Sequence, residues 1–437
     1  MKRLVMSFFM VLLIVMVVNG CQNLPGQLSE ETPGSTDVEE PGGSSEGGSY
    51  LLTLTSSEIL AGFGEYKDSF VLNNGSVVVG IQNYGEDETD LELKIFSLDD
   101  ATYTKSYKVF NKSGASYNIP VYLVGGWDEN HVWMIHSGPG SLTLFYQSSD
   151  KAHSINLEEE CGIINFNYKN EGKTLYIWQT PKNFWVFQFL DDGIKKKHIE
   201  IAPYGEIKSV VPGKSTGDFY IGLSDASVLK YRSFEKVGEI GFENAYVKDV
   251  KLSENGYLYA LVTAVEGGKN YLVKINPTTM TEVSSKLIDD GTFEANYIIP
   301  YLDRLVVLLS KPVALAGGYM EYYAVYDDEF NTIASPTTIG WMDVYPFGKS
   351  ILNPGYGVDS NGNLWFFLQQ RNPLYPSLNK ISHVLLVMDE DGKLLALEGR
   401  FDRVDHFSLK DDKGIVIEYD EYWGNEHLKT FSLVKSE

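Results

Sequence analysis

The residues whose spacing most resembles a metal-ligand set are Asp359, Asn361 and Asn363. Oxygen ligands at positions one, three and five are typical of a calcium-binding loop, which also needs Gly at position six and Glu at position twelve. This chain has Leu364 and Gln370 at those two positions. A hairpin turn explains the same residues, because Asn-Gly supplies positive φ angles and an apolar run follows. We therefore predict a turn between two strands here, and no metal site.

Carboxylate clusters are the next residues able to do chemistry. Paired carboxylates could serve acid/base catalysis on a glycosidic bond, although in so acidic a chain they are more often solvated turns. The clusters are Glu158-Glu159-Glu160, Asp289-Asp290, Asp411-Asp412 and Asp420-Glu421. His131 and His136 lie five residues apart, so on a strand they would face opposite sides and are poorly placed to share a metal. Cys161 fits a small buried apolar residue. The sequence thus predicts no catalytic residue and no cofactor.

Aromatic residues in loop-like segments are better candidates for a binding site. Trp and Tyr give a large contact area at a small cost in conformational entropy. With neighbouring charges such as Arg371 and Asp420, they could bind a sugar or a peptide. The predicted ligand-binding residues are Trp341, Tyr345, Arg371, Tyr375, Asp420, Tyr422 and Trp423. The alternative, in which these rings only pack against strand ends, stays open.

A repeated pattern indicates which elements hold these residues. A polar or Gly turn followed by four or five apolar residues occurs eight times, with starts about 48 residues apart on average. A repeat of 40–50 residues with four short strands is typical of a β-propeller blade. The apolar runs are Val77–Ile81, Val132–Ile135, Leu175–Trp178, Phe219–Leu223, Leu258–Val262, Leu305–Leu309, Leu364–Leu368 and Ile415–Tyr419. We predict an all-β fold, a β-propeller of eight blades with four antiparallel strands each. Seven blades remain possible if the weakest unit, around Ser209–Tyr231, is not a blade.

The two ends of the repeat region complement each other. The last unit, Asp405–Val434, holds three predicted strands, and Tyr50–Thr55 is a lone strand at the start. Pairing them would complete the last blade and close the ring, which removes open sheet edges. The aromatic candidates then belong to units six, seven and eight. We expect them on one face, because loops between second and third strands share a face with the blade-to-blade connections.

The first 20 residues have the pattern of a signal peptide. Two basic residues precede Leu4–Val18, which is too short for a comfortable membrane span of about 20 apolar residues. The following Val18-Asn19-Gly20-Cys21 resembles the bacterial lipobox, although Asn19 departs from its usual small residue. The resemblance implies cleavage before Cys21 and diacylation of the Cys21 thiol. An ordinary signal peptide or an N-terminal membrane helix is the alternative.

The next segment reads as a tether. Residues 22–49 contain six Gly, five Ser, three Pro and six carboxylates, with no Lys or Arg, so they cannot bury enough apolar surface to fold. A flexible chain of this length reaches roughly 30 Å. We predict three parts: a signal peptide over residues 1–20, a lipidated Cys and disordered acidic tether over 21–49, and a propeller domain over 50–437.

The net charge limits the kinds of partner that the protein can bind. The whole chain has 36 basic and 59 acidic residues, so nucleic acid would be repelled. An anionic membrane surface would be repelled too, and the N-terminal lipid is then the only expected membrane contact. We predict a protein of the bacterial cell envelope, anchored on the extracytoplasmic side of a membrane, with a protein or carbohydrate partner.

Two segments resemble a known blade signature. Asp359–Phe367 (DSNGNLWFF) and Ser253–Leu261 (SENGYLYAL) are similar to the strand pairs of bacterial propellers with six to eight blades and PQQ-like repeats. The docking tryptophans of quinoprotein enzymes do not recur. The resemblance implies a fold, and a fold does not imply a function. The preferred interpretation is a non-catalytic binding or scaffold protein. The alternatives are an envelope enzyme acting on polysaccharide through rim carboxylates, and an outer-membrane assembly factor, which lipoproteins with such propellers resemble.

The lipobox gives the first testable prediction. Substituting Cys21→Ala is expected to abolish both acyl labelling and membrane association, because the acidic mature domain has no other evident affinity for lipid. Metabolic labelling with a fatty-acid probe and membrane fractionation measure the two effects. A wild-type protein that takes up no label would contradict the lipoprotein interpretation.

Overall fold

The computed structural model describes most of the chain from residue 50 onward. The chain divides into two units, residues 1–47 and residues 48–437, and every element below belongs to the second. The signal peptide and tether predicted over residues 1–49 lie outside the described residues. Within the described ranges, no helix is long and apolar enough to cross a membrane. These ranges are 50–59, 65–84, 88–97, 103–113, 120–138, 141–201, 205–215, 217–313, 318–342, 356–371, 381–401, 403–410, 412–420 and 425–435.

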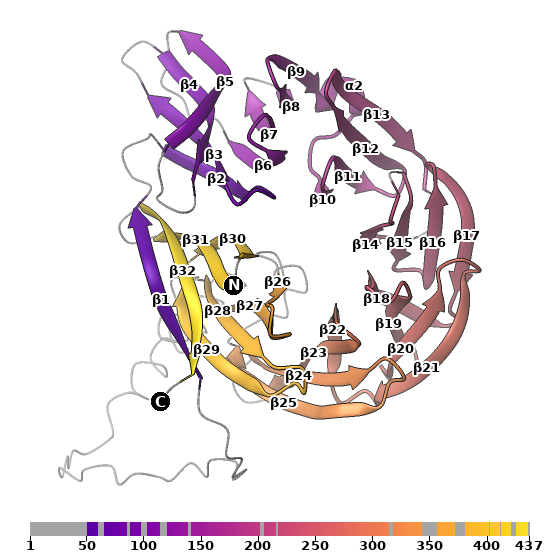
Figure 1. Cartoon of the computed structure of the whole chain (residues 1–437). Helices are drawn as coiled ribbons and strands as arrows, with labels where there is room; N and C mark the ends of the chain where they lie inside the picture. Colours follow the sequence, from indigo (N-terminus) through magenta and orange to yellow (C-terminus); the bar gives the residue numbers. More distant parts are fainter. Residues whose placement is uncertain are drawn as a thin grey trace, which may run out of the picture. The chain divides into compact units, whose positions relative to one another are not determined.

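The described strands form eight antiparallel sheets of four, arranged in a ring (Figure 1). We number the blades along the chain and give the innermost strand of each first. Blade 1 contains β2 (Glu65–Val71), β3 (Val77–Tyr84), β4 (Glu88–Phe96) and β5 (Tyr103–Ser113). Blade 2 contains β6 (Val121–Asp128), β7 (His131–Gly138), β8 (Ser141–Ser148) and β9 (Lys151–Asn156). Blade 3 contains β10 (Asn167–Glu171), β11 (Thr174–Thr180), β12 (Asn183–Leu190) and β13 (Gly193–Ile199). Blade 4 contains β14 (Ile207–Pro212), β15 (Phe219–Leu223), β16 (Ser227–Arg232) and β17 (Glu235–Gly241).

The second half of the ring repeats this order. Blade 5 contains β18 (Ala245–Leu252), β19 (Leu258–Ala264), β20 (Asn270–Asn276) and β21 (Thr281–Asp289). Blade 6 contains β22 (Glu294–Tyr301), β23 (Arg304–Val313), β24 (Gly318–Asp327) and β25 (Thr332–Met342). Blade 7 contains β26 (Tyr356–Val358), β27 (Leu364–Arg371), β28 (Ile381–Met388) and β29 (Leu394–Phe401). Blade 8 contains β30 (Arg403–Lys410), β31 (Lys413–Asp420), β32 (Asn425–Lys435) and β1 (Tyr50–Ile59).

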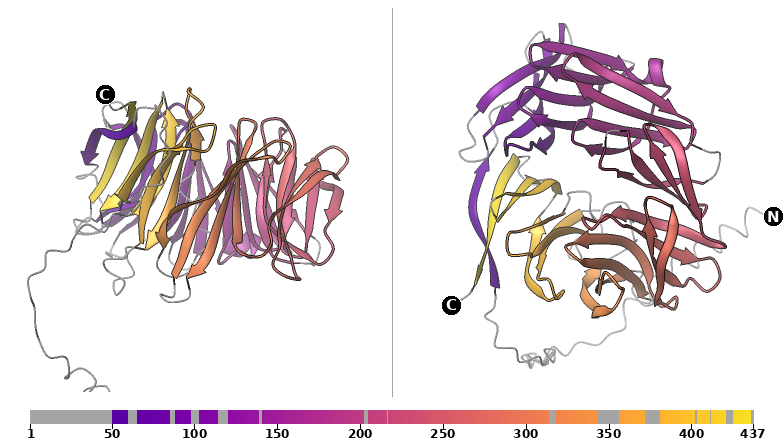
Figure 2. Two further views of the ribbon diagram at one scale, coloured as in Figure 1. Left: turned by 90° about the horizontal axis from the view of Figure 1, so that it is seen from below. Right: turned by 45° about the vertical axis from the view of Figure 1, so that its right-hand side comes forward.

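The prediction of eight four-stranded blades is confirmed. Each of the eight apolar runs forms part of the second strand of a blade. The alternative of seven blades is wrong, because the unit around Ser209–Tyr231 forms the complete sheet β14–β17. Figure 2 shows the same sheets from two further sides.

The predicted ring closure is also confirmed. Strand β1 pairs antiparallel with β32, from Tyr50 opposite Lys435 to Ile59 opposite His427. It is four residues longer than predicted, because pairing continues past a bulge near Leu54. Leu52 turns inward to the apolar cluster between blades 7 and 8, while Leu51 is 61% exposed.

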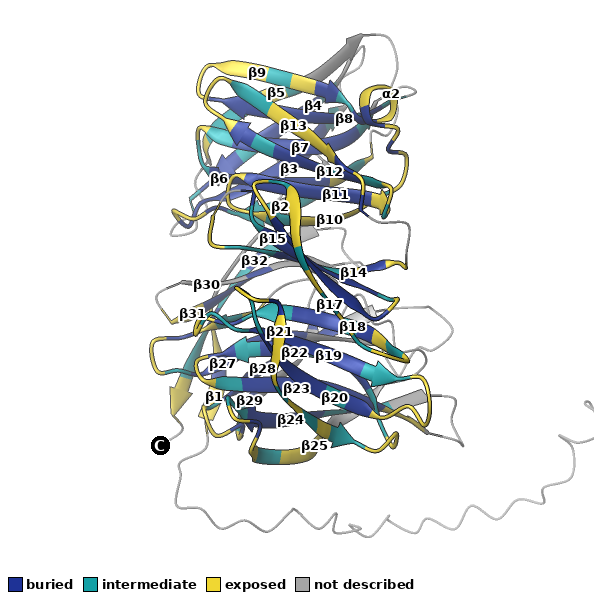
Figure 3. Ribbon diagram, turned by 90° about the vertical axis from the view of Figure 1, so that its right-hand side faces the viewer, coloured by how far each residue is buried: buried dark blue, intermediate teal, exposed yellow. Residues whose placement is uncertain are grey.

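The core consists of layers between blades. Among the described residues, eight apolar clusters each join two consecutive blades, and the last cluster joins blade 8 to blade 1. Alternate residues of a strand face opposite sides of its sheet. Leu364 and Phe366 therefore pack against blade 6, while Trp365 and Phe367 pack against blade 8. Burial on both faces explains the unbroken apolar runs, and Figure 3 shows buried inner strands with exposed outer strands and turns.

The turn before β27 shows how the hairpins are built. The Asp359 carboxylate accepts hydrogen bonds from the backbone N–H of Asn361 (3.0 Å) and Asn363 (2.8 Å) and from the Trp365 indole (3.0 Å). This confirms the turn, in which Asp359 uses its oxygens within the protein. One detail of the prediction is wrong: Gly362 alone has a positive φ (82°), and Asn361 does not. A type I turn followed by a left-handed residue is the usual form of such a loop.

A short helix between blades 2 and 3 was not expected. The Glu158-Glu159-Glu160 cluster lies in α2 (Leu157–Cys161), where the Asn156 side chain accepts a hydrogen bond from the Glu159 N–H. Acidic residues in a first helical turn suit the partial positive charge there. Cys161 is buried as predicted, and burial raises the pKa of its thiol to about 11.

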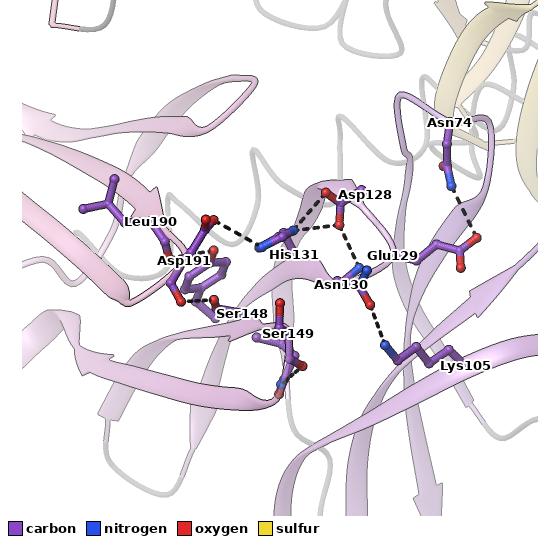
Figure 4. Close-up of polar contacts among 12 residues, drawn as sticks. Asn74, Lys105, Asp128, Glu129, Asn130, His131, Ser148, Ser149, Leu190 and Asp191 are labelled. Carbon is purple, nitrogen blue, oxygen red and sulfur yellow. Dashed lines mark hydrogen bonds and ion pairs between the residues drawn. The ribbon is translucent and has the colours of Figure 1, made fainter.

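Hydrogen bonds and ion pairs at the turns join successive blades. In Figure 4, the His131 ring contacts Asp128 of its own blade through Nδ1 (2.8 Å) and Asp191 of blade 3 through Nε2 (3.4 Å). Farther along the ring, the Lys274 ammonium of blade 5 binds the Asp328 carboxylate of blade 6 at 2.6 Å. The Tyr301 hydroxyl of blade 6 donates to the Asp389 carbonyl of blade 7 at 3.0 Å. These contacts link neighbouring blades at their turns.

Ring closure leads to a stability prediction with a matched control. Substituting Leu52→Ala should lower the free energy of unfolding by about 2–5 kcal/mol, because it opens a cavity between blades 7 and 8. Substituting the exposed neighbour Leu51→Ala should change it by less than about 0.5 kcal/mol. Urea unfolding followed by tryptophan fluorescence measures both. Equal losses in the two variants would contradict the role given to β1.

Candidate binding site

The two ends of each blade carry different connections between strands. At one end, which we call the connection end, the chain passes from the fourth strand of a blade to the first strand of the next. Because neighbouring strands are antiparallel, the link between second and third strands lies at this end too. The opposite end, the hairpin end, carries the turns between first and second strands. The chain passes from one blade to the next at these ends, including from β1 of blade 8 to β2 of blade 1, so the connection ends share one face of the ring.

The described part of the candidate site lies at the connection end. Trp341 pairs with Met320 near the end of β25, and Arg371 pairs with Ile381 at the end of β27. Asp420 pairs with Asn425 at the end of β31. The three strand ends belong to the consecutive blades 6, 7 and 8. The expectation that the three segments begin on a common face is thus met by the backbone.

The remaining predicted residues cannot be placed in the same way. Tyr345, Tyr375, Tyr422 and Trp423 lie outside the described residues. One part of the sequence prediction needs correction, because Trp341 is not in a loop. It lies in β25, which continues to Met342 and pairs with β24 up to Tyr319.

A row of polar residues crosses blade 6 close to Trp341 in register, and sequence reasoning missed it. Glu294 pairs with Ser310, which pairs with Glu321, so the three occupy neighbouring positions on successive strands. Ser310 accepts a hydrogen bond from the Asn296 amide at 3.0 Å, and Glu294 binds Lys248 of blade 5 at 3.2 Å. Glu321 is only 2% exposed, and its Oε1 has no hydrogen-bond partner among the described residues.

The environment of Glu321 changes its ionisation. Burial, with a smaller contribution from the Glu294 charge, raises the pKa of the Glu321 carboxyl from 4.5 to about 7. The group is therefore largely protonated in mildly acidic solution. A glutamate near the start of a strand gives no sequence signal for this, because its burial and its position beside Glu294 follow from the folded sheet.

The other candidate carboxylates serve local structure. Asp289 accepts hydrogen bonds from the backbone N–H of Gly291 (2.8 Å) and Phe293 (3.1 Å), and Asp412 accepts one from the Ser360 N–H (2.6 Å) of blade 7. Asp411 and Glu421 lie outside the described residues. In the part of the chain that the structure describes, no three His, Cys, Asp or Glu side chains are arranged to hold a metal ion.

Comparisons with known proteins give similar structures but no matching sequence family. No family model matches the chain, and no curated protein sequence matches it. BamB from Moraxella catarrhalis is 8% identical, with 87% of this chain and 99% of that chain covered and a TM-score of 0.43. Hydrazine synthase from Kuenenia stuttgartiensis is 13% identical, with 71% and 93% covered and a TM-score of 0.43. The Dos1 propeller is 11% identical, with 57% and 64% covered and a TM-score of 0.35.

The strand order and the ring define the class of protein. The chain is an eight-bladed β-propeller whose last blade is completed by its N-terminal strand. At such low identities and TM-scores, the similar structures carry no argument about function. The function must be argued from the residues at the ends and on the inner wall of the ring.

The buried carboxyl of blade 6 gives a pH prediction. Because the pKa of Glu321 is raised in the folded state, the folded protein binds more protons than the unfolded chain between about pH 4.5 and pH 7. Glu321 therefore costs stability as the pH rises through that window, by up to about 3 kcal/mol. The variant Glu321→Gln should escape this loss, so its advantage in the free energy of unfolding should grow from about pH 5 to about pH 8.

Urea unfolding at the two pH values measures the effect. The exposed residue Glu329 of the same blade provides the control, and Glu329→Gln should show no comparable growth. A Glu321→Gln variant whose stability follows the wild-type value at both pH values would disprove the raised pKa.

Proposed function

We propose that this protein is a non-catalytic binding or scaffold protein of the cell envelope, with its binding surface at the connection end of blades 6–8. The observation that carries the proposal is that β25, β27 and β31 all finish at the connection end of their blades. It brings the backbone positions of Trp341, Arg371 and Asp420 to one face of three consecutive blades. The intervening sequence adds Tyr345, Tyr375, Tyr422 and Trp423.

Length and composition support binding at this place. Residues 343–355 and 372–380 are the longest segments between strands of blades 6–8. Long loops in a compact fold are usually functional or disordered. Tyr, Trp and Arg are the residues most enriched at the energetic centres of protein interfaces. We therefore propose a protein partner first and a carbohydrate partner second, and we do not propose nucleic acid because of the acidic charge.

Binding is favoured over catalysis by what the described carboxylates do. Asp289 and Asp412 accept hydrogen bonds in turns, and Glu159 lies in the first turn of α2. Glu321 is buried. A glycosidase needs two carboxyl groups that flank a bond of the substrate. The enzyme alternative would therefore rest on residues such as Glu421, and it remains the second candidate.

The membrane anchor is part of the proposal. Diacylation of Cys21, followed by the acidic tether, would hold the ring on the extracytoplasmic side of a bacterial membrane with its faces free to bind. A role in outer-membrane assembly would be one form of such a scaffold.

The binding surface leads to a prediction on three aromatic residues. Substituting Trp341→Ala, Tyr375→Ala or Trp423→Ala should each weaken binding to a partner captured from envelope extract by roughly thirtyfold, the effect of losing about 2 kcal/mol. Affinity measured by biolayer interferometry and melting temperature measured by calorimetry are read together. Melting temperatures should stay within a few degrees of wild type.

The control is Tyr246→Ala, because Tyr246 is 47% exposed and lies in blade 5, outside the proposed surface. It should leave binding unchanged. Variants that lose melting temperature together with binding would show that the three rings are packing residues, and the proposed site would then be wrong.

A further inference from the structure

Three turns at the hairpin end contain asparagine followed by glycine. They are Asn74-Gly75 in blade 1, Asn255-Gly256 in blade 5 and Asn361-Gly362 in blade 7. The three asparagines are exposed, and each turn joins the first and second strands of its blade. Asn-Gly pairs can react within the chain, because glycine has no side chain to block the approach of its backbone nitrogen to the asparagine amide. The three turns therefore offer the same reaction in three surroundings.

The reaction is a deamidation through a cyclic imide. The glycine nitrogen forms a bond to the asparagine Cγ and loses its proton, the Cγ–Nδ2 bond breaks, and the amide group leaves as ammonia. Water then opens the imide at one of its two carbonyl groups. One opening gives aspartate, and the other gives isoaspartate, in which the backbone runs through Cγ. Water is the only co-reactant, and nothing is oxidised or reduced.

The attacking nitrogen is held alike in the three turns. The Gly75 N–H donates to the carbonyl three residues before it at 2.9 Å, and Gly256 and Gly362 each do so at 3.0 Å. The φ angles of the three glycines also agree, lying between 82° and 86°. The glycines therefore give no reason for the three sites to react at different rates.

The asparagine side chains are held differently, and in blades 1 and 5 both ends of the amide are bonded. The Asn74 Oδ1 accepts from the backbone N–H two residues later at 3.0 Å, and its Nδ2 donates to the Glu129 carboxylate of blade 2 at 3.3 Å. The Asn255 Oδ1 accepts from the corresponding N–H at 3.1 Å, and its Nδ2 donates to the Asp328 carboxylate of blade 6 at 2.8 Å. These hydrogen bonds must break before either Cγ can turn toward the glycine nitrogen.

Blade 7 differs because of Asp359. The N–H two residues after Asn361, that of Asn363, donates to the Asp359 carboxylate at 2.8 Å instead of to the Asn361 side chain. The other two turns have no carboxylate at the position of Asp359. Among the described residues, the Asn361 side-chain amide takes part in no hydrogen bond. Its Cγ can therefore turn toward the Gly362 nitrogen without breaking a side-chain hydrogen bond.

We propose that Asn361 is a site of non-enzymatic deamidation in the folded protein, and that it reacts faster than Asn74 and Asn255. Asp359 is a positioning residue for this reaction, since its carboxylate takes the N–H that would otherwise hold the Asn361 side chain. The site lies at the hairpin end and does not depend on the surface proposed at the connection end.

Deamidation changes a turn that joins blades 7 and 8. The Ser360 N–H, next to the reacting residue, donates to the Asp412 carboxylate of blade 8 at 2.6 Å. The product carries a new carboxylate on a turn that already contains Asp359 and contacts Asp412. Isoaspartate also adds one backbone atom between the N–H groups of residues 361 and 363, which Asp359 binds together. The modified turn cannot keep both of these hydrogen bonds in their present geometry.

The test is peptide mapping by mass spectrometry of the full chain during incubation at mildly alkaline pH. Conversion at the three asparagines is followed in one sample, and electron-transfer fragmentation distinguishes isoaspartate from aspartate. In the folded protein, Asn361 should react at least about tenfold faster than Asn255, the factor that corresponds to about 1.4 kcal/mol of side-chain hydrogen bonding. In concentrated urea, where these hydrogen bonds are lost, the three rates should become similar.

A variant of blade 7 tests the part played by Asp359. Substituting Asp359→Ser gives this turn the residue that blade 5 has at the same position, Ser253. The Asn363 N–H should then bond to the Asn361 side chain, so deamidation of Asn361 should become slower. A change that merely loosened the turn would make it faster, so the direction of the effect separates the two roles.

A variant of blade 2 tests the same cause at another site. Glu129→Ala removes the acceptor of the Asn74 Nδ2 and should speed deamidation of Asn74, while Glu129→Gln keeps an acceptor oxygen and should not. Neither should alter the rate at Asn361. The proposal is overturned if Asn361 reacts no faster than Asn74 and Asn255 in the unaltered folded protein, if the same order of rates persists in urea, or if Asp359→Ser accelerates the reaction.

Discussion

The packing of each blade against both of its neighbours is the interaction on which the rest of the structure depends. A four-stranded sheet with two apolar faces cannot be stable alone, because both faces need cover. Trp365 and Phe366 show the arrangement, since adjacent residues of one strand enter different layers. A ring gives every face a partner only if it closes. The pairing of β1 with β32, and the cluster joining Ile415 and Ile417 to Val77 and Val79, provide that closure.

In the closed ring, the residues that stabilise the fold lie apart from those that are open to solvent. The interblade layers and contacts such as Lys274 with Asp328 join each blade to the next. Exposed side chains on the first strands lie outside these layers and can therefore vary in type without loss of the fold. Tyr168 and Lys169 illustrate this freedom, because they occupy positions on a first strand that the packing leaves open.

The features of the fold that depend on local residue pattern and on repetition could be predicted from the sequence. The run Leu364–Leu368 after an Asp-Ser-Asn-Gly turn predicted a buried second strand, and its eightfold recurrence predicted the number of blades. The sequence did not predict α2, because this helix has only five residues and its start depends on a single capping side chain, that of Asn156. It placed Trp341 in a loop because pairing with Met320 lies outside any local pattern. The raised pKa of the Glu321 carboxyl comes from its burial and from Glu294 two strands away in the same sheet, so it could not be predicted from composition or spacing.

Footprinting of the protein in native membranes tests the central claim, that the connection end of blades 6–8 is the binding surface. Hydroxyl-radical labelling followed by mass spectrometry would compare the protein in its membrane with the same protein after purification. We predict protection in the membrane within residues 343–355, 372–380 and 421–424, with unchanged labelling at hairpin-end turns such as Asn361. Protection confined to the hairpin end, or equal labelling of the two samples throughout, would contradict it.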